Sequence, residues 1–168
     1  HVAGNIPILQ FPDGVTRENA TYQGEMIKQA DVNLLAYPLQ LITEPQQIKK
    51  DLDYYLPRMS PEGPAMGNAI LTVLAARSGD AERAYSLWQK SYQPNAAPPF
   101  GVLAECAGGT NPYFATGAGG FLQATFMGFG GLEITREGVK QRNTQLPEKW
   151  KQLTIKGIGV ERKTYLVR

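Results

Sequence analysis

One acidic side chain, Glu105, lies alone in a stretch of apolar and small residues that runs from Pro98 to Leu132. No other acid occurs between Glu82 and Glu133, and Glu105 is followed by a Gly-Gly turn, an Asn-Pro pair and a glycine-rich helix start. A carboxylate held by turns in such a setting can be presented to a pocket, because pocket residues tend to sit on loops fixed by a rigid scaffold. The alternative is an ordinary solvated loop acid, and composition alone favours that alternative.

Other chemistries find less support in the residue types. Cys106 directly follows Glu105, but no histidine lies nearby to activate it, which argues against a nucleophilic thiol. A single cysteine also excludes an internal disulfide framework. The only histidine is His1. We therefore expect no His-based triad, no His-bound phosphate, no metal site and no cofactor.

The composition describes one domain without an obvious polyanionic partner. The chain has 168 residues, 42% of them apolar, and a formal net charge of +2. From Glu133 onward nine Lys and Arg face four acids, whereas residues 1–132 carry eight against eleven. Because this basic surplus is spread along a tail, we interpret it as a solvated face and not as a nucleic-acid surface. No apolar run approaches the ~18 residues of a membrane span. The compartment stays open, with a periplasmic or extracellular location slightly favoured over a cytoplasmic one.

Helical periodicity dominates the region that must position Glu105. Apolar residues recur at helical spacing, bounded by proline, Gly-Asp and other stop signals, and predict a mainly α fold. The predicted helices cover residues 24–37, 43–55, 65–78, 81–92 and 113–128. Lys28 and Gln29 fall in the first turns of the first of these, where a lysine opposes the helix dipole. Lys28 is therefore either tolerated there or needed there.

The glycines of the last predicted helix carry a second hint. Gly117, Gly119 and Gly120 each weaken a helix by roughly 1 kcal/mol relative to alanine. Such a helix start indicates a close approach to the backbone, by another helix or by a ligand, and the residues alone leave both readings open. Residues 1–23 read as an irregular lead-in and 94–109 as a long loop. After Gly128 alternating residues predict short antiparallel strands attached to the helical body.

Four segments, in this order, resemble glycoside hydrolase family 65, and chiefly its hydrolytic branch of acid trehalases, kojibiose hydrolases and glucosylgalactosyl-hydroxylysine glucosidases. The similarity covers roughly residues 24–168. The segments that carry it are Ile27-Lys28-Gln29-Ala30-Asp31-Val32; Asp53-Tyr54-Tyr55 with Gly63-Pro64-Ala65-Met66; Pro99-Phe100 leading to Glu105; and Thr116-Gly117-Ala118-Gly119-Gly120-Phe121-Leu122-Gln123 with Gly128-Phe129-Gly130-Gly131-Leu132.

The resemblance implies a fold and a division of the chain. Residues 24–131 would form the C-terminal half of an (α/α)6 catalytic barrel, and residues 132–168 part of a C-terminal β domain. The resemblance also implies an inverting α-glucosidase, in which two carboxyl groups flank the scissile bond. Glu105 matches the general base of the hydrolases, and Lys28 and Gln29 match residues that hold the glucose hydroxyls. The general acid would lie in an upstream segment that this chain lacks.

The implied partners follow from that reading. They are an α-linked glucose disaccharide or glucoside, the N-terminal remainder of the same enzyme, and a second copy of the chain in a homodimer. The family's other branch, the disaccharide phosphorylases, grips phosphate with a histidine-containing loop. Residues 2–168 contain no histidine and Glu105 occupies the base position, which favours hydrolysis. The remaining alternatives are a non-catalytic helical module and a carbohydrate-binding piece without chemistry. For Phe100, Tyr113 and Phe114 we expect core packing ahead of sugar contact.

Overall fold

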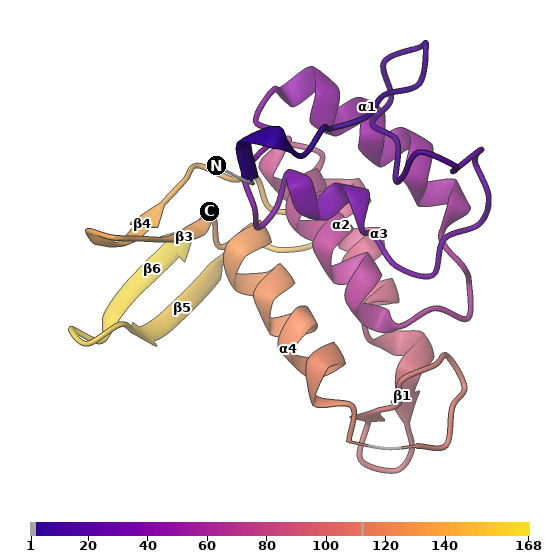
Figure 1. Cartoon of the computed structure of the whole chain (residues 1–168). Helices are drawn as coiled ribbons and strands as arrows, with labels where there is room; N and C mark the ends of the chain where they lie inside the picture. The colour runs from indigo at the N-terminus through magenta and orange to yellow at the C-terminus, as the bar shows by residue number, and fades with distance from the viewer. Residues whose placement is uncertain (1–2, 112) are drawn as a thin grey trace.

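A helical body carries two β-hairpins on one side (Figure 1). The computed structural model describes residues 3–111 and 113–168. The α-helices are α1 (Pro45–Tyr55), α2 (Ala65–Arg77), α3 (Ala81–Lys90) and α4 (Ala115–Gln123). Short 3₁₀ turns are η1 (Ala3–Asn5), η2 (Val32–Leu35), η3 (Leu56–Arg58) and η4 (Gln93–Asn95), and a π-helical segment is η5 (Ala124–Phe129). The strands are β1 (Ala96–Ala97), β2 (Val102–Leu103), β3 (Leu132–Thr135), β4 (Gly138–Gln141), β5 (Leu153–Ile158) and β6 (Lys163–Val167).

The predictions of α1, α2 and α3 are confirmed, because local signals determine these helices. Pro45 begins α1, and Leu52 and Tyr55 of its apolar stripe are buried. Gly79 ends the α2 segment with φ 82°, a left-handed conformation that suits glycine. Asp80 then caps α3, where its carboxylate accepts a hydrogen bond from the backbone N–H three residues on.

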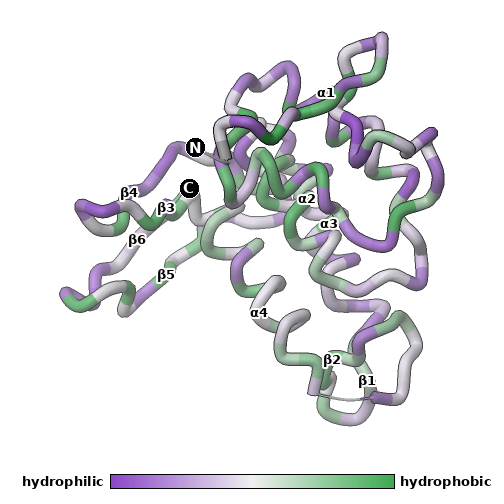
Figure 2. Tube along the Cα trace, viewed as in Figure 1, coloured by the Kyte–Doolittle hydropathy of each residue, from purple (hydrophilic) through white to green (hydrophobic). Residues whose placement is uncertain are grey.

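Helix α2 is the centre of the core. It packs against α3, α4 and η5, and most of its residues are buried, as its apolar character on several sides predicts. Figure 2 shows it as a largely hydrophobic segment, whereas the tip of the β3–β4 hairpin is hydrophilic. An aromatic cluster extends this core. The Trp88 indole N–H donates to Thr125 Oγ1 (2.9 Å), and the Trp88 ring meets Trp150 at 5.1 Å between centroids, so the segment after β4 is also held to the helices.

The predicted helix over residues 24–37 is wrong. Only Val32–Leu35 form a single 3₁₀ turn, and the chain before it is not helical. The N–H and C=O of Ile27 each form a 2.8 Å hydrogen bond to the chain on either side of Met59. Pairing with a distant segment therefore replaces the local helix. The argument that Lys28 opposes a helix dipole does not apply, because no helix begins there.

The helix predicted over 113–128 exists with shifted bounds, as α4 continued by η5. Its glycines differ in what surrounds them, and the helix-packing reading is confirmed for one of the three that the sequence analysis singled out, Gly120. A Cβ on Gly120 would lie 3.3 Å from the Ala69 Cβ of α2, so this glycine permits close helix packing. A Cβ on Gly119 would meet nothing within 4 Å and would stand in open space. A Cβ on Gly128 would lie 3.4 Å from the Val73 Cα, so this glycine also lies close to α2.

The tail forms the predicted antiparallel strands, but as two separate hairpins. β3 pairs with β4 and β5 pairs with β6, and a side-chain hydrogen bond from the Tyr165 hydroxyl to the Val139 carbonyl (3.3 Å) links the two. Arg77 at the end of α2 holds the junction between η5 and β3. Its guanidinium donates to the Met127 carbonyl (3.1 Å) and the Leu132 carbonyl (3.2 Å).

The described part of the lead-in is irregular apart from η1 and a β-bridge between Gln10 and Thr16, and a buried carboxylate fixes it to α1. Asp51, 3% exposed, accepts hydrogen bonds from the Thr16 N–H (2.8 Å), the Thr16 hydroxyl (2.7 Å) and the Gln47 side-chain amide (2.9 Å). The Tyr55 hydroxyl donates to the Thr16 carbonyl (2.7 Å). These bonds satisfy the buried acid without a cationic partner.

Candidate active site

The loop that carries Glu105 runs from β2 to α4 and is tied down at both ends. Asn95, 4% exposed, donates through Nδ2 to the carbonyls of Ala104 (3.1 Å) and Glu105 (3.0 Å). The Ala104 N–H donates to the Asn95 carbonyl (2.8 Å), and the Phe114 N–H donates to the Leu103 carbonyl (2.8 Å). The backbone beside Glu105 is therefore fixed to η4, and the end of β2 is fixed to the start of α4.

The Glu105 side chain is half-buried and meets a neutral partner from its own loop. Asn111 Nδ2 donates to Glu105 Oε2 at 3.5 Å, and the Glu105 N–H donates to Asn111 Oδ1 at 3.4 Å. None of the ion pairs in the described part of the chain includes Glu105. The prediction of an acid held by turns, away from charged groups, agrees with these contacts.

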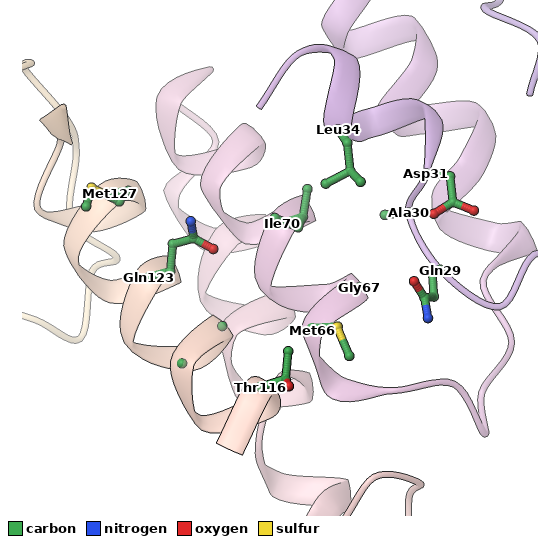
Figure 3. Close-up of a pocket in the computed structure, with 12 residues that line it drawn as sticks. Gln29, Ala30, Asp31, Leu34, Met66, Gly67, Ile70, Thr116, Gln123 and Met127 are labelled. Atoms are coloured by element: carbon green, nitrogen blue, oxygen red, sulfur yellow. The ribbon is translucent and has the colours of Figure 1, made fainter. Parts of the chain in front are cut away.

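An open cavity of ≈ 570 Å³ lies between three parts of the chain: residues 29–34, helix α2 and helix α4 with its continuation η5 (Figure 3). This volume is within the range of small-molecule sites. Its lining residues are Gln29, Ala30, Asp31, Leu34, Met66, Gly67, Ile70, Thr116, Gly119, Gly120, Gln123 and Met127. The cavity thus contains both the open glycine of α4 and one residue of the Lys28-Gln29 pair.

Polar groups stand at opposite sides of a mostly apolar hollow. Figure 3 shows Gln29 and Asp31 on one side and Gln123 of α4 on the other, with Leu34 and Ile70 between them. Asp31 is the one charged residue among the described residues that line the cavity, and it is exposed. Amide and carboxylate groups on apolar walls can bind sugar hydroxyls, which both donate and accept hydrogen bonds.

The buried Tyr37 forms a side-chain hydrogen bond with Gln123, one of the residues that line the cavity. Burial raises the pKa of Tyr37, an effect that the nearby Arg77 charge and a hydrogen bond with Gln123 oppose. The Arg77 guanidinium lies over the Tyr37 ring at 4.7 Å. Burial in turn lowers the pKa of Arg77. The tyrosine therefore stays a neutral hydroxyl near pH 7, available to orient the amide.

The structure brings only part of the predicted site into this cavity. Gln29 lines it, whereas Lys28 is exposed and, like Glu105, is not among the lining residues. The backbone at Lys28 lies close to Gly63, where only glycine leaves room, since a Cβ on Gly63 would lie 2.7 Å from the Lys28 carbonyl oxygen. The Glu105 loop adjoins the cavity through the start of α4, where Thr116 is a lining residue.

Two aromatic residues near this loop do not pack in the core. Phe100 is 89% exposed and Tyr113 is 81% exposed, so the expectation of core packing is wrong for both, while Phe114 is half-buried. Phe100 lies at the tip of the tight β1–β2 hairpin, which is too short to bury a side chain there. The sequence analysis also missed a cavity role for Asp31 and Gln123, although both lie inside the segments that carried the family resemblance.

The described residues contain no group of three or more His, Cys, Asp or Glu side chains arranged to hold a metal ion. Among them, no helix combines the length and the apolar character needed to cross a membrane.

Comparison with known proteins identifies the family. Residues 14–97 match the family model of the glycosyl hydrolase family 65 central catalytic domain, and the chain belongs to this family. A kojibiose hydrolase of Mucilaginibacter mallensis is 59% identical over 99% of the chain, and one of Flavobacterium johnsoniae is 52% identical over the same share. A solved structure titled as a putative kojibiose phosphorylase from human microbiome covers 78% of the chain with a TM-score of 0.56 and 18% identity, which supports the fold.

The match covers only part of each relative. The chain spans 25% of the length of both kojibiose hydrolases and 18% of the solved chain. The resemblance read from the four sequence segments is thus confirmed at the level of the family. The family model matches from residue 14 and so includes Thr16, which the buried Asp51 carboxylate binds.

Proposed function

We propose that this chain forms part of an enzyme that hydrolyses α-glucosides with inversion of configuration, in which Glu105 is the general base. The observation that supports this most is the environment of Glu105 and the way its loop is fixed. It is a half-buried carboxylate with no ion pair among the described residues, on a loop fixed to η4 and to the start of α4. The 59% identity to a kojibiose hydrolase makes kojibiose the first substrate to test.

In this proposal, ionised Glu105 removes a proton from a water molecule as that water attacks the anomeric carbon of glucose. A second carboxyl group protonates the leaving oxygen from the other face. Inverting glycosidases keep the two groups about 6.5–9.5 Å apart to admit the water. Lys28 and Gln29 would hold the glucose hydroxyls. The position of Gln29 in the cavity supports its share of that role.

The proposal assigns the rest of the machinery to the remainder of a longer protein. Residues 24–131 would contribute the C-terminal half of an (α/α)6 barrel and residues 132–168 part of a β domain. The general acid would come from outside this chain, which agrees with its coverage of a quarter of its relatives' length. By the same reasoning, the isolated chain should lack glycosidase activity and should oligomerise, for example as a homodimer, through the face left open beside α2 and α4.

The experiment is a Glu105→Gln substitution in the full-length protein. General-base catalysis contributes ~10²–10⁴-fold, so we expect kcat on kojibiose to fall by that order while glucose binding is retained. Glu62→Gln is the matched control, because Glu62 is an exposed acid and should leave turnover unchanged. Wild-type turnover in Glu105→Gln would contradict the proposal.

Product analysis separates the alternatives. Inverting hydrolysis of an α-glucoside releases β-glucose first, which NMR detects before mutarotation. Formation of glucose 1-phosphate only when inorganic phosphate is present would indicate a phosphorylase instead. Trehalose, nigerose and maltose test the linkage. Sugar binding without any product would favour a binding module.

A further inference from the structure

We infer that Asn111 is the positioning residue that aims the Glu105 carboxylate, an inference that rests on the proposed function. The two residues are joined twice. The Glu105 N–H donates to Asn111 Oδ1 (3.4 Å), and Asn111 Nδ2 donates to Glu105 Oε2 (3.5 Å). One amide therefore contacts both the backbone and the carboxylate of the same glutamate.

This double contact fixes which end of the amide faces the acid. A backbone N–H can only donate, so it selects the Oδ1 end of Asn111, and the NH₂ end is left to face Oε2. Gly109 leaves room for that arrangement. A Cβ on Gly109 would lie 3.2 Å from Asn111 Oδ1 and 2.9 Å from the Cys106 carbonyl oxygen. The loop is thus shaped around the amide.

The amide matters because charged groups are scarce around Glu105. It is the only charged residue between Lys90 and Glu133, so η4, the β1–β2 hairpin and α4 contribute no charge. Lys90, at the end of the neighbouring α3, is exposed. Cys106 and Tyr113 are the other titratable groups of the loop, and both are exposed.

Under these conditions, Asn111 is the polar side chain whose replacement most directly changes the surroundings of the carboxylate. Donation to the charged form of an acid lowers its pKa, and a like charge raises it. Distances of 3.4–3.5 Å make each contact weak, as is common for catalytic groups without bound substrate. Replacing the amide should therefore have a modest and measurable effect, in the direction that this rule gives.

The test is the pH profile of kcat/KM in the full-length protein carrying Asn111→Asp. Aspartate keeps the oxygen that accepts from the Glu105 N–H but replaces the donor with a second carboxylate. We expect the acidic limb to move up by about one pH unit. Asn111→Ala should move it up by roughly half a unit. On the plateau kcat should fall about tenfold through misorientation, with KM changed less than about twofold.

Asn143→Asp is the matched control, because Asn143 is exposed and its substitution adds the same negative charge at a position away from Glu105. An unshifted acidic limb in Asn111→Asp, or an equal shift in Asn143→Asp, would overturn the inference. If both Asn111 variants lose their folded circular dichroism spectrum, the role is structural and the inference is also wrong. Wild-type activity in Glu105→Gln would instead remove the proposed function, so the two failures can be told apart.

Discussion

The same substitution at two neighbouring glycines of α4 should have different effects on the free energy of unfolding. Gly119→Ala and Gly120→Ala both add one methyl group to a helical position, and both should gain about 1 kcal/mol of helix propensity. The structure separates them. The new Cβ at Gly119 would meet no atom within 4 Å, whereas the one at Gly120 would lie 3.3 Å from the Ala69 Cβ and 3.5 Å from the Met66 Cα.

The magnitudes follow from that difference. Gly119→Ala should raise the free energy of unfolding by roughly the full propensity gain, about 1 kcal/mol. Gly120→Ala must move α4 away from α2 by a few tenths of an ångström, and overpacking of this kind costs about 1–3 kcal/mol. Its net effect should be near zero or a loss of about 2 kcal/mol. For a chain of this size, 1 kcal/mol corresponds to roughly 2–4 °C in Tm.

The assay is urea unfolding of the chain followed by circular dichroism at one fixed protein concentration, because any self-association would make stability depend on concentration. The denaturant slopes of the variants and the wild type should agree, so that midpoints report stability. Equal stabilisation by both substitutions would refute the reasoning, since it would mean that the contact between α2 and Gly120 places no limit on side-chain size.

Three further substitutions test contacts that hold the rest of the fold together. Asp51→Ala should cost about 2–4 kcal/mol because three hydrogen bonds, two of them buried, lose their acceptor. A double-mutant cycle with Thr16→Ala in urea unfolding should return a coupling energy above about 0.5 kcal/mol, and additive effects would contradict this. Arg77→Met keeps the aliphatic stem but removes two hydrogen bonds to backbone carbonyls, so unfolding should show a loss of about 2–3 kcal/mol, and an unchanged midpoint would be the contrary result. Hydrogen bonds from Arg142 lower the pKa of Glu133, so their stabilisation is present above about pH 4.3 and is lost as pH falls through the lower folded-state pKa. Arg142→Gln should therefore cost a few tenths of a kcal/mol near pH 7 and nothing at pH 2, as measured by unfolding at both values.

Local signals in the sequence predicted most of the helices. Pro45, Gly79 and Asp80 act on their own immediate neighbours, so helix starts and stops near them follow from the residues alone. The prediction of a helix from Gly24 to Tyr37 was wrong for the opposite reason. The apolar spacing of this segment fits a helix, but Ile27 pairs with the chain beside Met59, and no local pattern announces such a partner.

The candidate site divides in the same way. An isolated Glu105 among turns was visible in the sequence, and Gln29 was found through the family resemblance. Asn95 and Asn111 were not singled out, because each acts across 6 to 10 residues of irregular chain that has no period to read. The β1–β2 hairpin, which brings Asn95 to Glu105, has only two residues in each strand, too few to show alternation.

The way in which Arg77 joins η5 to β3 has a consequence for which substitutions this junction tolerates. Its guanidinium donates hydrogen bonds to the main-chain carbonyl oxygens at positions 127 and 132, and the side chains of those residues take no part in these bonds. Any amino acid can offer the same carbonyl. These two hydrogen bonds therefore place no demand on the side chains at positions 127 and 132, and it is burial, at 1% exposure, that restricts Leu132.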